Sequence, residues 1–202
     1  MDFKKSQTKI NIMRAFAGES QAWMRYTFSA SKVKTAGFWF LNNIFTISAA
    51  QEKEHAEIFY NLLKSESGTQ IEIPGANYPV DNVDDPIGLL LAAVKNETDE
   101  ATDVYPSFAE TAKKEGFADI QFTFEKIALI EQMHADRFGC FAKLLEESKL
   151  FEGDKDTEWI CLNCGHIHKG PIAPTSCPVC NHAQGYFVPF KYYKFIAEKY
   201  SK

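Results

Sequence analysis

Two four-residue phrases decide how this chain folds: Glu52-Lys53-Glu54-His55 and Glu131-Gln132-Met133-His134. In each phrase the glutamate and the histidine stand three residues apart, so they share one face of a helix. Both phrases lie within rows of mainly apolar residues spaced three and four apart, which predict amphipathic helices. The rows are Leu41, Phe45, Ser48, Phe59 and Leu62 around the first phrase, and Phe124, Ile127, Phe138, Phe141 and Leu145 around the second. The carboxylates and imidazoles are therefore expected to point into the interior of a helical bundle.

Two further predicted helices place glutamates on apolar stripes. The first runs from about Ser6 to Lys34 and carries Glu19. The other runs from about Pro86 to Gly116 and carries Glu97, with Glu100 one turn further along. Pro106, inside the latter helix, should kink it or remove one hydrogen bond. The phrase helices are expected at about 38–65 and 117–150.

The segment between residues 66 and 85 is rich in turn residues and longer than antiparallel neighbours in a bundle require. It predicts a long crossover between helices that run parallel, which is a known bundle variant.

Carboxylates in an apolar interior require compensation, because an unpaired buried charge is costly. One Glu from each of two helices plus Glu-x-x-His from each of the other two is the pattern of di-iron and di-manganese bundles. Carboxylate oxygens with imidazole suit iron or manganese. The predicted ligands are Glu19, Glu52, His55, Glu97, Glu100, Glu131 and His134. For Glu100, a solvated helix position is the alternative.

The C-terminal quarter has a different character. Two Cys-x-x-Cys knuckles, Cys161 with Cys164 and Cys177 with Cys180, predict one tetrahedral four-thiolate metal site. Sulfur ligation alone leaves iron and zinc open. The remaining cysteine, Cys140, is expected to be a small buried hydrophobe.

Composition narrows the class of protein. Apolar residues make up 45% of the 202 residues and charged residues 24%, which is typical of a globular protein. The net charge of −5 does not suit a nucleic-acid binder, and no apolar run approaches the length of a membrane span. The polar N-terminus shows no targeting signal, so a cytoplasmic location is expected. We predict a mainly α protein with domains at 1–152 and 153–202, the second ending in an aromatic tail that is either strand or short helix.

In these motifs the chain resembles the rubrerythrin family over roughly residues 14–187. The resemblance rests on Ala17-Gly-Glu19-Ser-Gln-Ala, Glu52-Lys-Glu-His55-Ala, Glu97-Thr-Asp-Glu100, Tyr105-Pro-Ser-Phe-Ala, Glu131-Gln-Met-His134-Ala and the stretch from Trp159 to Cys180. It implies a ferritin-like four-helix domain with a non-haem di-iron site and a rubredoxin-like domain that holds one iron in four cysteines.

The resemblance also implies an activity, partners and residue roles. The activity is reduction of hydrogen peroxide to water, with electrons from an NAD(P)H-dependent reductase or a rubredoxin, in a homodimer or tetramer. Glu52 and Glu131 resemble bridging ligands, Glu19 and Glu97 terminal ligands, and His134 a permanent ligand. His55 and Glu100 resemble a pair that exchanges at one iron. Tyr26 and Tyr105 match tyrosines that hydrogen-bond to ligands, with an ordinary core aromatic as the alternative for Tyr26.

Three functions compete at this point. A peroxide reductase in which Glu100 supplies protons explains both metal motifs. A ferroxidase or iron-storage protein that uses dioxygen shares the bundle but gives no reason for an attached one-electron carrier. A non-enzymatic protein with a zinc ribbon would be colourless, whereas ferric iron in four thiolates is red.

Overall fold

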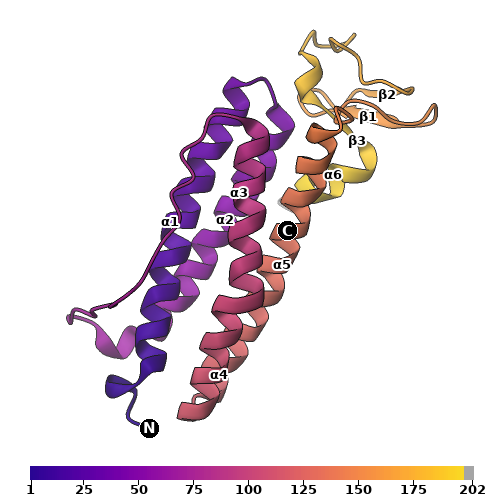
Figure 1. The fold of residues 1–202 in the computed structure, drawn as a ribbon. Helices are drawn as coiled ribbons and strands as arrows, with labels where there is room; N and C mark the ends of the chain where they lie inside the picture. The colour runs from indigo at the N-terminus through magenta and orange to yellow at the C-terminus, as the bar shows by residue number, and fades with distance from the viewer. Residues whose placement is uncertain (198–202) are drawn as a thin grey trace.

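The computed structural model describes residues 1–197 as long helices followed by a small three-stranded sheet (Figure 1). The α-helices of the bundle are α1 (Gln7–Thr35), α2 (Trp39–Leu62), α3 (Pro86–Asp99), α4 (Tyr105–Glu115) and α5 (Ala118–Glu146). Short 3-10 turns at Phe3–Lys5 and Lys64–Glu66 flank the first two helices. The fold is the mainly α bundle with a small C-terminal module that the sequence predicted.

Local sequence signals set the ends of these helices. The Ser6 side chain accepts a hydrogen bond from the Lys9 backbone N–H and so caps α1. Asp85 caps α3 in the same way, and Pro86 occupies the first turn, where its missing N–H costs nothing. Gly116 ends α4 with a left-handed backbone (φ 86°).

The helices pair as two hairpins. α1 packs mainly on α2, and α3 with α4 packs mainly on α5. The segment 67–85 runs along the bundle from the end of α2 to the opposite end, where α3 begins, so α2 and α3 are parallel (Figure 1). The predicted crossover is confirmed, and its length is explained by the distance that it has to span.

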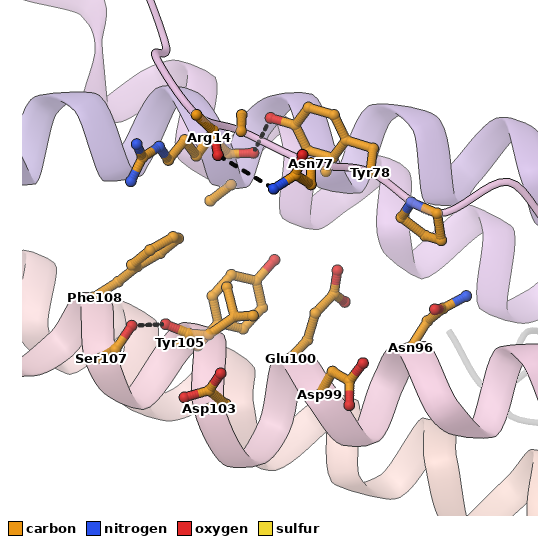
Figure 2. Close-up of a pocket in the computed structure, with 16 residues that line it drawn as sticks. Arg14, Asn77, Tyr78, Asn96, Asp99, Glu100, Asp103, Tyr105, Ser107 and Phe108 are labelled. Carbon is orange, nitrogen blue, oxygen red and sulfur yellow. Dashed lines mark hydrogen bonds between the residues drawn. The ribbon is translucent and has the colours of Figure 1, made fainter.

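The third helical stretch differs from the single helix expected over 86–116. A π-helical segment, Glu100–Val104, separates α3 from α4, and the Tyr105 N–H bonds to the Glu100 carbonyl five residues back. Pro106 lies in the first turn of α4, directly after this segment. The predicted disturbance is therefore a π turn, a feature frequent at functional sites. The segment faces α1 and the crossover across a cleft (Figure 2).

The bundle interior consists of two apolar layers with a polar layer between them. One layer contains Tyr26, Phe45 and Phe138, and the other contains Phe59 and Phe124. Glu19, Glu52 and Glu131 each lie between residues of the two layers in their own helices. Water is therefore excluded from above and below the glutamates, which strengthens every electrostatic interaction among them.

The C-terminal module is an antiparallel sheet with strand order β2-β1-β3. The strands are β1 (Glu158–Cys161), β2 (Ile167–Lys169) and β3 (Phe187–Pro189), and Trp159 lies opposite both His168 and Pro189. Trp159 is fully buried and donates its indole N–H to the Gly170 carbonyl at 2.8 Å. This small module has a core of its own around Trp159, Phe187, Cys161 and Cys177.

The module packs on the end of the bundle where α2 begins. Tyr186 stacks on Trp39 with ring centroids 4.5 Å apart. Gly185 lies so close to the bundle that a Cβ there would be 1.7 Å from the Gly37 carbonyl oxygen. Only glycine permits this close approach of the two backbones, so Gly185 is required for the module to pack against the bundle in this position.

The aromatic tail forms α6 (Phe190–Ala197), and Tyr192 packs edge-on against Phe141 of α5, with ring centroids 5.5 Å apart. The rest of the predicted aromatic tail, residues 198–202, lies outside the described residues. Cys140 is half-buried rather than fully buried as predicted. Within residues 1–197, no helix combines the length and apolar character that crossing a membrane requires.

Candidate metal centres

Six of the seven predicted ligands of the bundle converge in its middle layer. They come from four helices: Glu19 from α1, Glu52 and His55 from α2, Glu97 from α3, and Glu131 and His134 from α5. None is more than 5% exposed. The two hairpins therefore meet along a line of acid and imidazole groups.

These side chains form two overlapping sets, each with ligand atoms within 4.8 Å of one another. One set is Glu19, Glu52, His55 and Glu131, and the other is Glu52, Glu97, Glu131 and His134. Glu52 and Glu131 belong to both. Two adjacent cation positions that share two carboxylates are the geometry that a dinuclear site requires.

Unpartnered buried atoms test whether the residues fit metal ions. In the described structure, Glu19 Oε2, Glu52 Oε1, Glu97 Oε2, both Glu131 carboxylate oxygens and His134 Nδ1 are buried without hydrogen-bond partners. His134 Nδ1 lies 2.8 Å from Glu131 Oε2 and 3.0 Å from Glu52 Oε1, but without hydrogen-bond geometry. One nitrogen cannot serve several carboxylates at once. Such a cluster is costly unless cations occupy it, and oxygen with imidazole suits iron.

Two buried tyrosines hydrogen-bond to the outer carboxylates, by which we mean Glu19 and Glu97, the glutamates that belong to only one set each. Tyr26 donates its hydroxyl hydrogen bond to Glu97 Oε1, and Tyr105 donates to Glu19 Oε1. Burial and the nearby carboxylates hold the pKa of both tyrosines well above the ordinary value, so both remain donors. The alternative of an ordinary core aromatic for Tyr26 does not account for this bond.

In the metal-free protein, protons must partly replace the cations. Burial, with the charge of Glu52, raises the pKa of Glu97 to about 8. Burial, with the charge of Glu131, raises the pKa of Glu19 well above its usual range. Burial opposes the charge of Glu52, but the imidazoles of His134 and His55 outweigh it and lower its pKa. Metal binding must therefore release protons.

The four knuckle cysteines converge on a second centre. The Sγ–Sγ distances Cys161–Cys180 and Cys164–Cys177 are both 3.7 Å. A tetrahedron with metal–sulfur bonds of about 2.3 Å has edges of about 3.8 Å, whereas a disulfide would need about 2 Å. With all four sulfur atoms within 4.8 Å of one another, the thiols are placed to bind one metal ion.

The backbone of the two knuckles explains why the thiols converge. Gly165 (φ 77°) and Asn181 (φ 59°) turn the chain after each pair, in a left-handed conformation that glycine and asparagine tolerate. Each donates its N–H back to the first cysteine of its knuckle. His166, His168 and His182 are not part of the four-cysteine set.

Comparison with known proteins identifies the family. Residues 11–142 match the family model "Rubrerythrin", and residues 159–188 match "Rubrerythrin, rubredoxin-like domain". The chain belongs to the rubrerythrin family. Rubrerythrin-1 of Clostridium acetobutylicum is 43% identical over 91% of this chain and 94% of its own. A rubrerythrin of Nitratidesulfovibrio vulgaris is 40% identical over the same shares of the two chains.

Solved structures agree with this assignment. Nigerythrin in its mixed-valence state has a TM-score of 0.60 and 26% identity, over 92% of this chain and 90% of its own. Rubrerythrins are oxidoreductases with a ferritin-like fold, a di-iron carboxylate site and a rubredoxin-like iron site, the latter an electron-transfer module. The predicted family, fold and cofactors are thereby confirmed.

Glu100 is the predicted ligand that the rubrerythrin bundle does not bring into either set. It lies at the start of the π segment and lines the cleft of about 340 Å³ between that segment, α1 and the crossover (Figure 2). Burial and the charges of Glu19 and Glu97 raise its pKa well above the ordinary value. Glu100 is half-buried and lines this cleft, outside both ligand sets.

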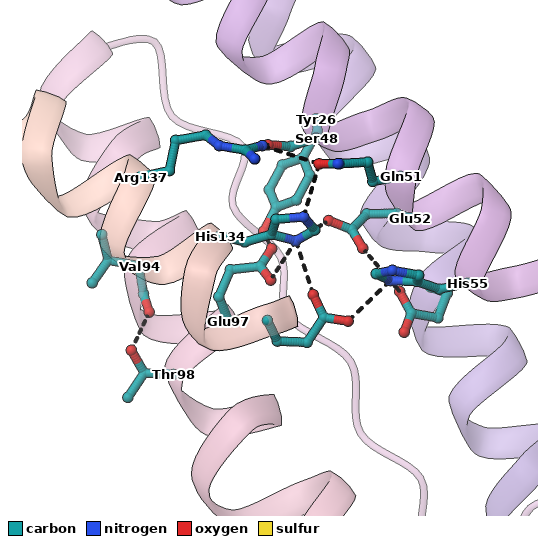
Figure 3. A network of polar contacts seen from close by, with 12 residues as sticks. Tyr26, Ser48, Gln51, Glu52, His55, Val94, Glu97, Thr98, His134 and Arg137 are labelled. Carbon is teal, nitrogen blue, oxygen red and sulfur yellow. Dashed lines mark hydrogen bonds and ion pairs between the residues drawn. The ribbon is translucent and has the colours of Figure 1, made fainter. Parts of the chain in front are cut away.

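Sequence reasoning missed two side chains behind His134. Gln51 Oε1 lies 3.0 Å from His134 Nε2, and Arg137 donates to the same oxygen at 3.0 Å (Figure 3). Arg137 is 3% exposed. The sequence contained an indication of Arg137. Glu131, His134 and Arg137 follow one another at intervals of three residues, so all three share one face of α5.

Proposed function

We propose that this protein is a hydrogen peroxide reductase with a di-iron centre in its bundle. The main support for this proposal is a buried cluster of four carboxylates and two imidazoles, in a chain that also contains a four-cysteine site suited to one-electron transfer. The reaction balances as one peroxide, two electrons and two protons giving two waters. When bound, the iron pair would supply the two electrons and Lewis acidity.

The ligand roles that we propose follow the two sets. Glu52 and Glu131 would bridge the two positions, because they are common to both sets. Glu19 and His55 would complete one position, and Glu97 and His134 the other. Tyr26 and Tyr105 would fix the outer carboxylates through their hydroxyl groups, so that neither carboxylate rotates away from its position.

Glu100 is the proposed proton donor, and the cleft is the proposed path of peroxide. Burial and four neighbouring glutamates disfavour its charge and raise the pKa of its carboxyl group well above the ordinary value. Gly18 of α1 lines the opposite side of the cleft. A Cβ atom at this position would lie 3.9 Å from Glu100 Oε1, so the missing side chain leaves space beside the carboxyl group. A carboxyl group with a raised pKa that lines a cleft suits general-acid catalysis. Exchange between Glu100 and His55 at one iron is part of the same proposal.

Electrons would enter through the four-cysteine iron from a rubredoxin or an NAD(P)H-dependent reductase. The module contacts α2 at Trp39, and Glu52 lies thirteen residues further along that helix. At 1.5 Å per residue this is about 20 Å. So long a path within one chain supports a homodimer or tetramer in which a partner's module approaches the cluster. A cytoplasmic location, without nucleic-acid or membrane partners, completes the proposal.

The deciding experiment is anaerobic reduction followed by rapid mixing with peroxide and, separately, with air. We expect fast oxidation by peroxide and slow oxidation by air. The reverse order would refute the proposal in favour of a ferroxidase.

A variant tests the role of Glu100. Glu100→Ala should slow peroxide turnover by about 10²- to 10⁴-fold, the usual contribution of a general acid, with three metals per chain retained. Glu110→Ala, at the exposed Glu110–Lys114 ion pair of α4, is the matched control. Turnover of Glu100→Ala at the wild-type rate would contradict the role of Glu100 as proton donor.

A further inference from the structure

The contacts of Arg137 determine the chemical state of a predicted metal ligand. Arg137 donates one hydrogen bond to Ser48 Oγ at 3.1 Å and one to Gln51 Oε1 at 3.0 Å, both on α2 (Figure 3). A guanidinium has only donors. The amide atom of Gln51 that faces Arg137 must therefore be its oxygen, which fixes the orientation of the amide group.

That orientation fixes the tautomer of His134 in turn. The same Gln51 oxygen lies 3.0 Å from His134 Nε2. Since an amide oxygen only accepts, His134 Nε2 must carry the proton. The lone pair of the neutral ring is then on Nδ1, the atom that lies 2.8 Å from Glu131, 3.0 Å from Glu52 and 3.4 Å from Glu97. Arg137 therefore directs a metal-binding lone pair into the cluster without touching the cluster itself.

The burial of Arg137 needs compensation of its own, because its side chain is 3% exposed. A buried guanidinium is costly unless acceptors and opposite charge surround it. The Ser48 and Gln51 oxygens are acceptors, and the carboxylates beside His134 supply opposite charge.

We propose that Arg137 is a positioning residue of the metal pair, acting through Gln51 to hold His134 in the tautomer that binds metal. The inference rests on the ligand roles proposed above but not on the identity of the substrate. It applies to one metal position only, because His134 belongs to one of the two sets. Residues behind a metal ligand typically change metal affinity 10- to 100-fold.

The test is stepwise titration of the full-length, metal-free protein with Co²⁺, in which thiolate absorption separately reports filling of the four-cysteine site. Arg137→Met introduces a side chain of similar length that donates no hydrogen bond, so the Gln51 amide group is free to rotate by 180°. We expect 10- to 100-fold weaker binding at one bundle position and unchanged binding at the other. Gln51→Leu, which removes the oxygen itself, should behave alike and replaces Arg137→Met if that variant does not fold.

Two variants separate positioning from a purely structural role. Arg137→Lys keeps a donor toward Gln51 and should restore much of the lost affinity. Ser48→Ala removes an acceptor of Arg137 that does not contact His134, leaves the Gln51 contact, and should bind metal as wild type does. In zinc-loaded wild-type protein, nitrogen NMR should show the His134 proton on Nε2, and in Gln51→Leu this fixed assignment should be lost.

The outcomes are distinct. Equal weakening at both bundle positions, or no weakening at either, would overturn the positioning role while leaving the ligand roles intact. A wild-type chain that binds Co²⁺ only at its four cysteines would refute the ligand assignment itself, and this inference with it.

Discussion

Replacing Tyr26 with phenylalanine isolates the contribution of a single hydroxyl group to the metal site. Tyr26 is 2% exposed, and its ring packs on Phe45 and Phe138 with centroids 5.9 and 5.2 Å away. A phenylalanine ring keeps these contacts, so the loss is confined to the bond from the hydroxyl to Glu97. A hydrogen bond to a charged group contributes about 1.5–3 kcal/mol. At 1.4 kcal/mol per factor of ten, that is roughly a 10- to 150-fold loss of affinity at the Glu97–His134 position.

The assay is competition with a chelator for the two bundle metals, followed position by position. Tyr105→Phe provides the mirror image, because Tyr105 donates to Glu19 and should weaken the Glu19–His55 position instead. Tyr60→Phe is the control, since Tyr60 is 61% exposed and stacks on Phe16 away from the glutamates. If Tyr26→Phe bound both metals as tightly as wild type, the hydroxyl would contribute nothing to holding Glu97, and the proposed support of the outer carboxylates would be wrong.

Three further predictions address pH, the second metal centre and the seat of the module. The metal-free protein should lose stability as the pH rises from about 4.5 to 8. Folding raises the pKa of Glu97 from 4.5 to about 8, so its contribution is complete below pH 4.5 and has been lost once the pH passes about 8. Urea midpoints across this range measure the effect, and a flat profile would contradict it. Cys164→Ala should remove one iron per chain and the red colour of the thiolate site, while both bundle metals remain. The control Cys140→Ala should keep all three metals. Metal analysis and visible spectra of the two variants test this prediction. Gly185→Ala should unseat the module, because its Cβ would be 1.7 Å from the Gly37 carbonyl oxygen, whereas Gly139→Ala meets Val94 at an ordinary 3.7 Å and should be tolerated. Limited proteolysis of the linker at 152–157 distinguishes the two, and equal resistance would refute the close-contact argument.

Much of the architecture was predictable because local signals agree with one another. Most of the rows around Glu52 and Glu131 are buried as expected, with Phe45, Phe59 and Phe138 fully inside, whereas Leu62 and Leu145 at the row ends are half-buried. The caps at Asp85 and Gly116 are where turn chemistry predicts them. Spacing of three along a helix suffices to place Glu and His on one face, since helix geometry is fixed by the backbone alone.

Other features depended on contacts between segments far apart in the chain. Pro106 predicted a disturbance, but the π turn that leaves Glu100 beside the cleft, outside both ligand sets, depends on how α3, α4 and α5 pack. The sequence did not decide whether the tail forms a strand or a helix. In the structure it is a helix, and Tyr192 of this helix packs against Phe141 of α5. Arg137 was overlooked because helical spacing shows which face a residue shares but not which side chains of another helix lie opposite it.

The sequence by itself predicted the candidate metal ligands, because ligand chemistry is a property of residue type and helical spacing aligns those groups on the inner faces. The family resemblance already implied bridging by Glu52 and Glu131 and hydrogen bonds from Tyr26 and Tyr105 to ligands. Only the tertiary structure decided that Tyr26 donates to Glu97 and Tyr105 to Glu19, and that Arg137 sets the tautomer of His134 through Gln51. These are distances between helices, and they are set by the packing of large side chains in the two apolar layers rather than by any local pattern.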